Sequence, residues 1–87
     1  MKLKNDFVLR YVADSWIILP LGTAVDFNRM LRLNEAGALL WKALEQGGDR
    51  ETLADELTKE YTVDRTQALT DVDAFLKKLI QIGCLEE

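Results

Sequence analysis

The chain changes from a strand pattern to a helix pattern within residues 29–44, RMLRLNEAGALLWKAL. Up to Leu33 the apolar and charged side chains partly alternate, with Leu31 and Leu33 on one face, as expected for a short strand with one open edge. From Asn34 onward the spacing is helical. Asn34 is a favourable N-cap, and positions 36, 40, 43 and 44 form a wide apolar stripe. The sequence therefore predicts a strand over 29–33 and a helix that runs through Leu44.

Two further strands are expected before this stretch. Residues 7–13 and 16–19 are rich in β-branched and aromatic side chains. Asp14 and Ser15 stand between them, a connection of the length that hairpins prefer. Pro20 cannot donate to a sheet, so it ends the second strand or lies at an edge. Residues 21–28 are expected to form a loop with some apolar content.

Two more helices are expected after it. Gly47 and Gly48 end the first helix, and Asp49 caps a second helix with apolar residues at four-residue spacing. Asp64 caps a third helix, with Gln67 in the capping-box position, and this helix ends at Gly83. The predicted fold class is α+β and winged-helix-like, with a three-stranded antiparallel sheet followed by three helices in a single domain over 1–87.

The third helix carries more apolar surface than packing against one neighbouring element needs. Positions 69, 72, 76 and 80 line one face, and positions 68, 72, 75, 79 and 82 line a neighbouring face. Together they exceed the stripe of ~100° that a simple surface helix needs. Either the helix is central and packs on two neighbours, or part of the stripe stays open as a groove for a partner.

Composition weakens an enzymatic interpretation. A chain of 87 residues has little apolar material to spare for a large enclosed site. It has no histidine, one serine (Ser15) and one cysteine (Cys84), so we expect no catalytic residue, metal site or cofactor. Asp71 and Asp73 are two residues apart on a helix and cannot share a proton. The start of the chain lacks a signal peptide and no stretch could span a membrane, so a cytoplasmic location is expected.

Charge is unevenly distributed along the chain. Residues 1–33 carry five bases and three acids, whereas residues 34–87 carry six bases and twelve acids. Since the acidic helical half would have to approach phosphates, an acidic winged-helix DNA-binding protein is a distant alternative.

A binding module for a peptide or protein remains. An incoming strand would pair with the open edge at 29–33 and bury side chains against the third helix.

The residues from Leu33 to Trp41 resemble the pattern L-N-x-x-G-x-x-[ILV]-W of the PqqD family, the coenzyme PQQ synthesis protein D group. The resemblance covers most of residues 7–85 in the family's order and spacing. It continues through Leu44, Gly47-Gly48, Leu53-Ala54-x-x-Leu57, Glu60-Tyr61-x-Val63, Asp71-Val72-x-x-Phe75-Leu76-x-x-Leu79 and Ile82-Gly83-Cys84-Leu85.

The resemblance implies a small cytoplasmic protein that binds the leader of a ribosomally made precursor peptide. The leader would add a strand to the third strand, against the third helix, and be presented to a radical S-adenosylmethionine enzyme or another modifying enzyme. Carried over to this chain, the peptide-binding residues are Arg29, Met30, Leu31, Arg32, Leu33, Ala68, Leu69, Val72, Phe75 and Leu76. Asn34 and Trp41 would be structural, as a cap and a core anchor.

Some alternatives stay open at this point. Residues 20–27 depart from members of the PQQ pathway, so the resemblance leaves the peptide system open; relatives serve lasso-peptide, thiopeptide and cyclodehydratase systems. A regulatory protein-interaction domain of the same fold is the main rival to a leader-binding chaperone. A homodimer is also left open, whereas nucleic-acid and membrane partners are not expected.

Overall fold

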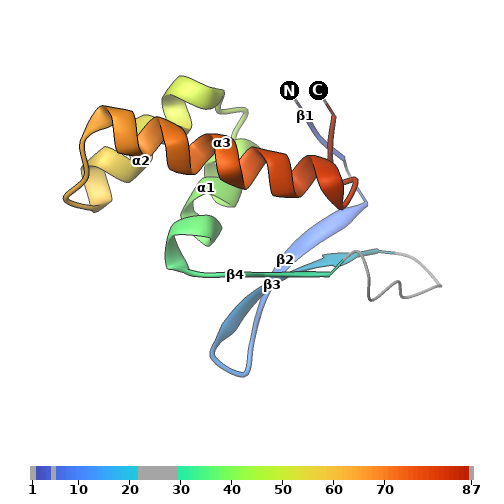
Figure 1. Ribbon diagram of the computed structural model, residues 1–87. Helices are drawn as coiled ribbons and strands as arrows, with labels where there is room; N and C mark the ends of the chain where they lie inside the picture. The colour runs from blue at the N-terminus through green and yellow to red at the C-terminus, as the bar shows by residue number, and fades with distance from the viewer. Residues whose placement is uncertain (1, 5, 22–29, 87) are drawn as a thin grey trace.

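The computed structural model describes residues 2–4, 6–21 and 30–86 of the chain. Three helices lie on one side of a small antiparallel sheet, and the two ends of the chain meet beside the third helix (Figure 1). In chain order the elements are β1 (Lys2–Leu3), β2 (Phe7–Val12), β3 (Ser15–Pro20), β4 (Leu31–Leu33), α1 (Glu35–Glu45), α2 (Arg50–Glu60), α3 (Arg65–Gln81) and β5 (Leu85–Glu86). The predicted three-stranded sheet is confirmed, with the strand order β2-β3-β4.

The hairpin turn lies one residue earlier than predicted. Ala13 and Asp14 occupy it, with φ angles of 50° and 63°, while Ser15 already pairs with Val12. Two consecutive residues with positive φ are typical of the two-residue turn whose twist matches that of the flanking strands. Since alanine gives no signal for such a turn, the assignment of Asp14-Ser15 was wrong by one position.

The third strand is shorter than predicted. Its pairing with β3 ends at Ile18↔Leu31, and Met30 precedes the strand. Pro20 is the last residue of β3, opposite Phe7, and it has no N–H to offer on either side, which helps to end the β3–β4 ladder. Arg29 and the expected loop at 22–28 lie outside the described residues.

Two short strands were missed. β1 and β5 form a second, two-stranded antiparallel sheet that joins the chain ends, with Lys2 opposite Glu86 and Leu3 opposite Leu85. The N–H of Lys4 also donates to the carbonyl of Cys84 at 3.0 Å. The order of three strands followed by three helices is therefore incomplete. Strands of two residues have no alternation for a sequence pattern to detect.

The helix starts agree with the predicted caps. The side chains of Asn34, Asp49 and Asp64 each accept a hydrogen bond from the backbone N–H three residues later, at 2.8 to 2.9 Å. Gln67, however, does not reach back to the cap: its amide nitrogen donates to Asp71 at 2.9 Å. The predicted capping box is thus only half formed.

The core lies between the helices and the inner face of the sheet. Trp41 is 1% exposed, which confirms its predicted place in the core. α3 packs on α2 and on β5, and it buries its main apolar stripe. The side chains without measurable exposure are Ile18, Leu53, Ala54, Ala68, Val72, Leu79 and Cys84. Within the described ranges, none of the helices has the length and apolarity that a bilayer crossing requires.

Candidate functional site

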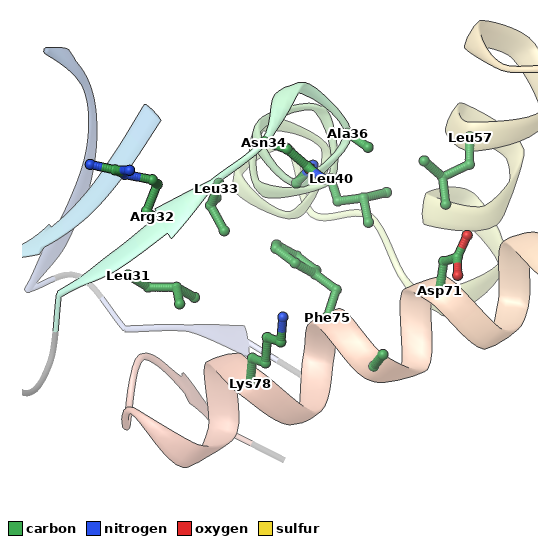
Figure 2. Close-up of a pocket in the computed structure, with 12 residues that line it drawn as sticks. Leu31, Arg32, Leu33, Asn34, Ala36, Leu40, Leu57, Asp71, Phe75 and Lys78 are labelled. Atoms are coloured by element: carbon green, nitrogen blue, oxygen red, sulfur yellow. The ribbon is translucent and has the colours of Figure 1, made fainter. Parts of the chain in front are cut away.

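A groove of about 390 Å³ runs between β4 and α3 (Figure 2). β4 and the start of α1 form one wall, α3 forms the other, and α2 closes one end. The residues that line it are Leu31, Arg32, Leu33, Asn34, Ala36, Gly37, Leu40, Leu57, Asp71, Ala74, Phe75 and Lys78. It therefore lies at the strand and the helix that the sequence singled out.

The turn register determines which backbone groups of β3 face β4. Val12 and Ser15 flank a two-residue turn, so they form a hydrogen-bonded pair, and such pairs recur at every second residue. The N–H of Leu21 donates to the carbonyl of Asp6 at 2.6 Å, which agrees with this register at the far end of the hairpin. The odd-numbered residues of β3 thus bond to β2, and the even-numbered ones point their backbone groups at β4.

Arg32 is left with its backbone groups on the open edge. The even-numbered residues Trp16 and Ile18 pair with Leu33 and Leu31, so the N–H and C=O groups of these two β4 residues are directed to β3. Those of Arg32, between them, are directed away from β3, since backbone groups alternate along a strand. This edge carries the unpaired donor and acceptor that an additional strand needs.

The floor of the groove is apolar. Leu33 and Phe75 point toward each other (Figure 2), and each is 8% exposed. Leu31 is half-buried beside them and packs against the core. The side chain of Arg32 points away from α3 (Figure 2), as alternation requires. An added strand would therefore find backbone partners at Arg32 and apolar contacts at its neighbours.

Gly37 lets α1 approach β4 closely. A Cβ at this position would lie 3.1 Å from the Cβ of Leu33 and 3.2 Å from its Cδ2. These distances are tighter than ordinary van der Waals contact, so a larger residue would require Leu33 or the helix to shift by a few tenths of an ångström. The glycine of the motif in residues 33–41 thus serves the wall of the groove.

The α3 face in the groove is not the face with the most apolar residues. Ala68 and Val72 are fully buried in the core, and Leu76 is 8% exposed and also belongs to it. Leu69 is half-buried. Of the predicted helix residues, only Phe75 lines the groove. Of the predicted strand residues, Leu31, Arg32 and Leu33 line it, Met30 is half-buried just before them, and Arg29 lies outside the described residues.

Asp71, Ala74 and Lys78 complete the helical wall of the groove. Sequence reasoning passed over them because two are charged and one is small. Their spacing with Phe75 could have identified them, since residues at i, i+3, i+4 and i+7 share one helix face. Asp71 is exposed and also borders the groove.

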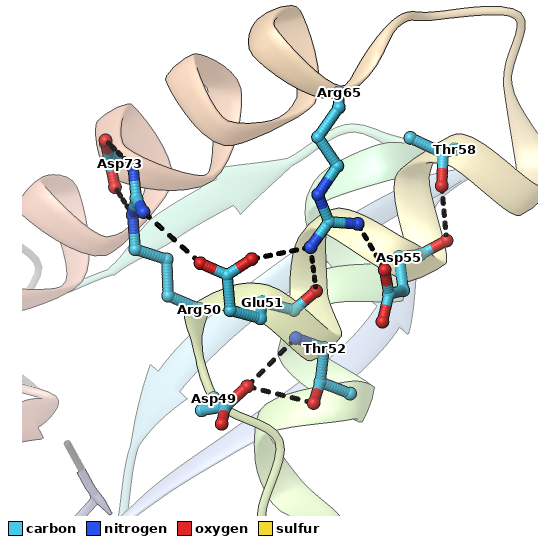
Figure 3. A network of polar contacts seen from close by, with 8 residues as sticks. All are labelled: Asp49, Arg50, Glu51, Thr52, Asp55, Thr58, Arg65 and Asp73. Carbon is cyan, nitrogen blue, oxygen red and sulfur yellow. Dashed lines mark hydrogen bonds and ion pairs between the residues drawn. The ribbon is translucent and has the colours of Figure 1, made fainter.

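Ion pairs join α2 to α3 and hold the helical wall (Figure 3). The guanidinium of Arg50 donates to both carboxylate oxygens of Asp73, at 2.7 and 2.9 Å. Arg65 donates to Glu51 at 2.6 Å and also to Asp55. The hydrogen bonds from Arg50 lower the pKa of Asp73 below its ordinary value. These side chains are exposed, yet they bridge the two helices.

The same ion pairs count against nucleic-acid binding. Arg65 lies at the start of α3, where a recognition helix would offer it to bases or phosphates. Here its guanidinium is engaged by carboxylates of α2. Asp71 and Asp73 follow on the same helix, and they would repel a phosphate backbone.

The groove offers backbone hydrogen bonds, apolar contacts and, on its α3 wall, two charged side chains. Among the described residues, no three His, Cys, Asp or Glu side chains gather closely enough to hold a metal ion. Cys84 is fully buried, with its sulfur 3.5 Å from the carbonyl of Leu79. Cys84 therefore packs as a small core residue.

Comparisons with known proteins point to one family. The family model described as "Coenzyme PQQ synthesis protein D (PqqD)" matches residues 15–85. The chain resembles a solved structure described as "TbiB1 in Complex with the TbiA(beta) Leader Peptide", with 30% identity, a TM-score of 0.81, and coverage of 99% of this chain and 95% of that one.

A second solved structure is similar to the same extent. It is described as "Lasso peptide synthetase B1 complexed with the leader peptide", with 26% identity, a TM-score of 0.80, and coverage of 99% of this chain and 96% of the other. No curated protein matched the chain. The matches confirm the predicted resemblance and the predicted fold over nearly the whole chain.

Proposed function

This chain belongs to the PqqD family, and from that premise we propose that it binds the leader of a ribosomally made precursor peptide. The leader adds a strand to the open edge of β4, beside α3. The observation that carries the proposal is the outward direction of the Arg32 backbone, next to the groove floored by Phe75. Two similar structures described as leader-peptide complexes support it.

The β4 backbone and the apolar floor of the groove contribute differently to binding. The backbone of the added strand pairs with Arg32, which demands little of the peptide sequence. Alternate peptide side chains turn toward α3 and meet Leu31, Leu33 and Phe75. Each net backbone hydrogen bond contributes about 0.5–1.5 kcal/mol, so the apolar contacts supply much of the affinity and select the peptide.

The domain itself acts as a non-catalytic chaperone in this proposal. It holds the leader while a separate enzyme modifies another part of the same peptide, so it needs no reactive group of its own. The family resemblance points to a radical S-adenosylmethionine enzyme, and the similar structure described as a lasso peptide synthetase B1 points to a lasso-peptide system. The complex forms in the cytoplasm, where precursor peptides are made. A homodimer through β4 would compete with the leader for the same edge.

Two variants of one residue test strand addition. A candidate leader peptide is labelled with a fluorophore, and its binding is followed by fluorescence anisotropy. Arg32→Pro and Arg32→Ala both remove the guanidinium, but only proline removes the outward N–H and places a ring at the edge. We expect Arg32→Pro to weaken binding at least about tenfold and Arg32→Ala less than about threefold. Equal affinities of the two variants would refute strand addition at β4.

Leu31→Pro is the control for the fold. Its N–H is directed to β3, so the substitution breaks a bond of the existing sheet. Arg32→Pro should melt close to the parent protein, because proline is tolerated where the N–H faces outward from an edge strand. Leu31→Pro should melt at a clearly lower temperature. The reverse order would show that the backbone of Arg32 is not on the open edge.

A further inference from the structure

Two opposite charges bracket the apolar floor of the groove. Asp71, Phe75 and Lys78 lie on one face of α3, and Figure 2 shows all three side chains directed into the space below β4. At a rise of ~1.5 Å per residue, Asp71 and Lys78 are ~10 Å apart along the helix. Phe75 stands between them. The groove thus has a negative end, an apolar middle and a positive end.

Within residues 2–4, 6–21 and 30–86, no oppositely charged side chain pairs with Asp71 or Lys78. Arg50, Arg65 and Asp73, on the surface shared by α2 and α3, are all held in ion pairs. Among the described residues, no carboxylate forms an ion pair with Lys78, and Asp71 has only the side-chain amide of Gln67. A bound peptide would therefore meet both charges with their pairing capacity still available.

The helix dipole does not account for the place of Lys78. A cation in the last turn of a helix is favourable wherever it stands around the axis. The dipole thus favours Lys78 in the last turn of α3 without determining the side of the helix on which it lies, and Lys78 lies on the side that lines the groove, whereas its neighbour Lys77 does not line it. Lys77 is therefore a matched control for a role that depends on position in the groove.

The charges lie in register with an added strand. Leu31 is near Lys78, and Asn34 lies toward the Asp71 end (Figure 2), so β4 and α3 run in opposite directions. Peptide side chains on one face repeat every ~6.7 Å. Three alternate positions span ~13 Å, about 3 Å more than the separation of Asp71 and Lys78 along the helix, and the long side chain of Lys78 can cover this difference.

Resting on the proposed function, we propose that the groove selects and orients the leader by charge. A basic peptide residue faces Asp71, an apolar residue two positions on faces Phe75, and an acidic residue two further on faces Lys78. Because the sheet is antiparallel and antiparallel addition is the commoner mode, the motif reads basic-x-apolar-x-acidic from N- to C-terminus. The opposite direction would meet like charges at both ends.

A display library of random 12-residue peptides tests the motif. It is panned against the parent protein, Lys78→Glu, Asp71→Lys and the control Lys77→Glu, after melting curves establish that each is folded. The parent and Lys77→Glu should enrich the same motif. Lys78→Glu should change the preferred residue from acidic to basic at the last position alone, and Asp71→Lys should reverse the first.

Synthetic peptides then measure the size of the effect. Replacing the acidic residue of the best parent-selected peptide by lysine should weaken binding to the parent about fivefold, and Lys78→Glu should restore it. If apolar peptides are enriched without any charge bias, and Lys78→Glu leaves the selection unchanged, charge selection is wrong while strand addition stands. If no enriched peptide loses binding to Arg32→Pro, strand addition fails, and the motif fails with it.

Discussion

Substitution of Trp41 should reduce the stability of the fold more than substitution of any other core residue. Its indole nitrogen allows two substitutions to be distinguished. The side chain is 1% exposed, and its N–H has no acceptor among the described residues. Truncation of such a side chain to alanine costs ~3–5 kcal/mol. A domain of 87 residues has only about 4–13 kcal/mol in total, so Trp41→Ala should leave it marginal or unfolded.

Substitution of Trp41 by phenylalanine distinguishes the contribution of the apolar ring from that of the indole N–H. Trp41→Phe keeps most of the apolar contact and removes the N–H, and a buried donor without a partner costs ~1–3 kcal/mol. That relief should offset much of the lost packing, so we expect Trp41→Phe to stay within about 1.5 kcal/mol of the parent.

Thermal melting followed by circular dichroism distinguishes the two variants. At this chain length ~1 kcal/mol corresponds to about 5–6 °C, so Trp41→Ala should lower the melting temperature by ~15–25 °C and Trp41→Phe by less than about 8 °C. Equal losses for both variants would mean that the indole N–H finds an acceptor. A parent-like Trp41→Ala would refute the place of Trp41 in the core.

Two other predictions concern the hairpin and the response to pH. Ala13→Asn with Asp14→Gly should stabilise the protein by about 1 kcal/mol, because both positions have positive φ; a lower melting temperature would contradict the assigned turn. Hydrogen bonds hold the pKa of both Asp49 and Asp73 below 3.8. Their contribution is therefore present above pH 3.8 and lost as the pH falls through these lowered pKa values. Asp73→Asn should melt lower than the parent at neutral pH and approach it at acid pH, and a constant difference between the two would contradict the pairing with Arg50.

The helices could be predicted because their signals are local. Asn34, Asp49 and Asp64 each mark a helix start by side-chain chemistry within four residues, and the apolar spacing behind them is helical. The hairpin was found from composition, but its turn was misplaced because neither Ala13 nor Asp14 is a glycine. β1 and β5 lie at opposite ends of the sequence and pair with each other, and no local sequence pattern predicts that contact.

The site could be predicted at the level of elements but not of every side chain. Both the unpaired edge expected at the third strand and the family resemblance indicated that a peptide would bind at β4 and α3. On α3, however, apolar content marks the side chains that the core needs, and Val72 is fully buried for this reason. The groove is lined by the adjacent row of α3 side chains, which includes Asp71 and Lys78. Because these two residues are charged, apolar spacing does not identify that row. That Arg32 rather than its neighbours faces outward follows only from the observed turn register.

The most direct test of the account is hydrogen exchange at the backbone amide of Arg32, with and without bound leader peptide. In the free protein this amide should exchange quickly, while Leu31 and Leu33, whose amides bond to β3, should already be protected. Addition of the leader should slow exchange at Arg32 by at least about tenfold and change Leu31 and Leu33 little. Protection that appears elsewhere while Arg32 stays open would contradict strand addition at β4.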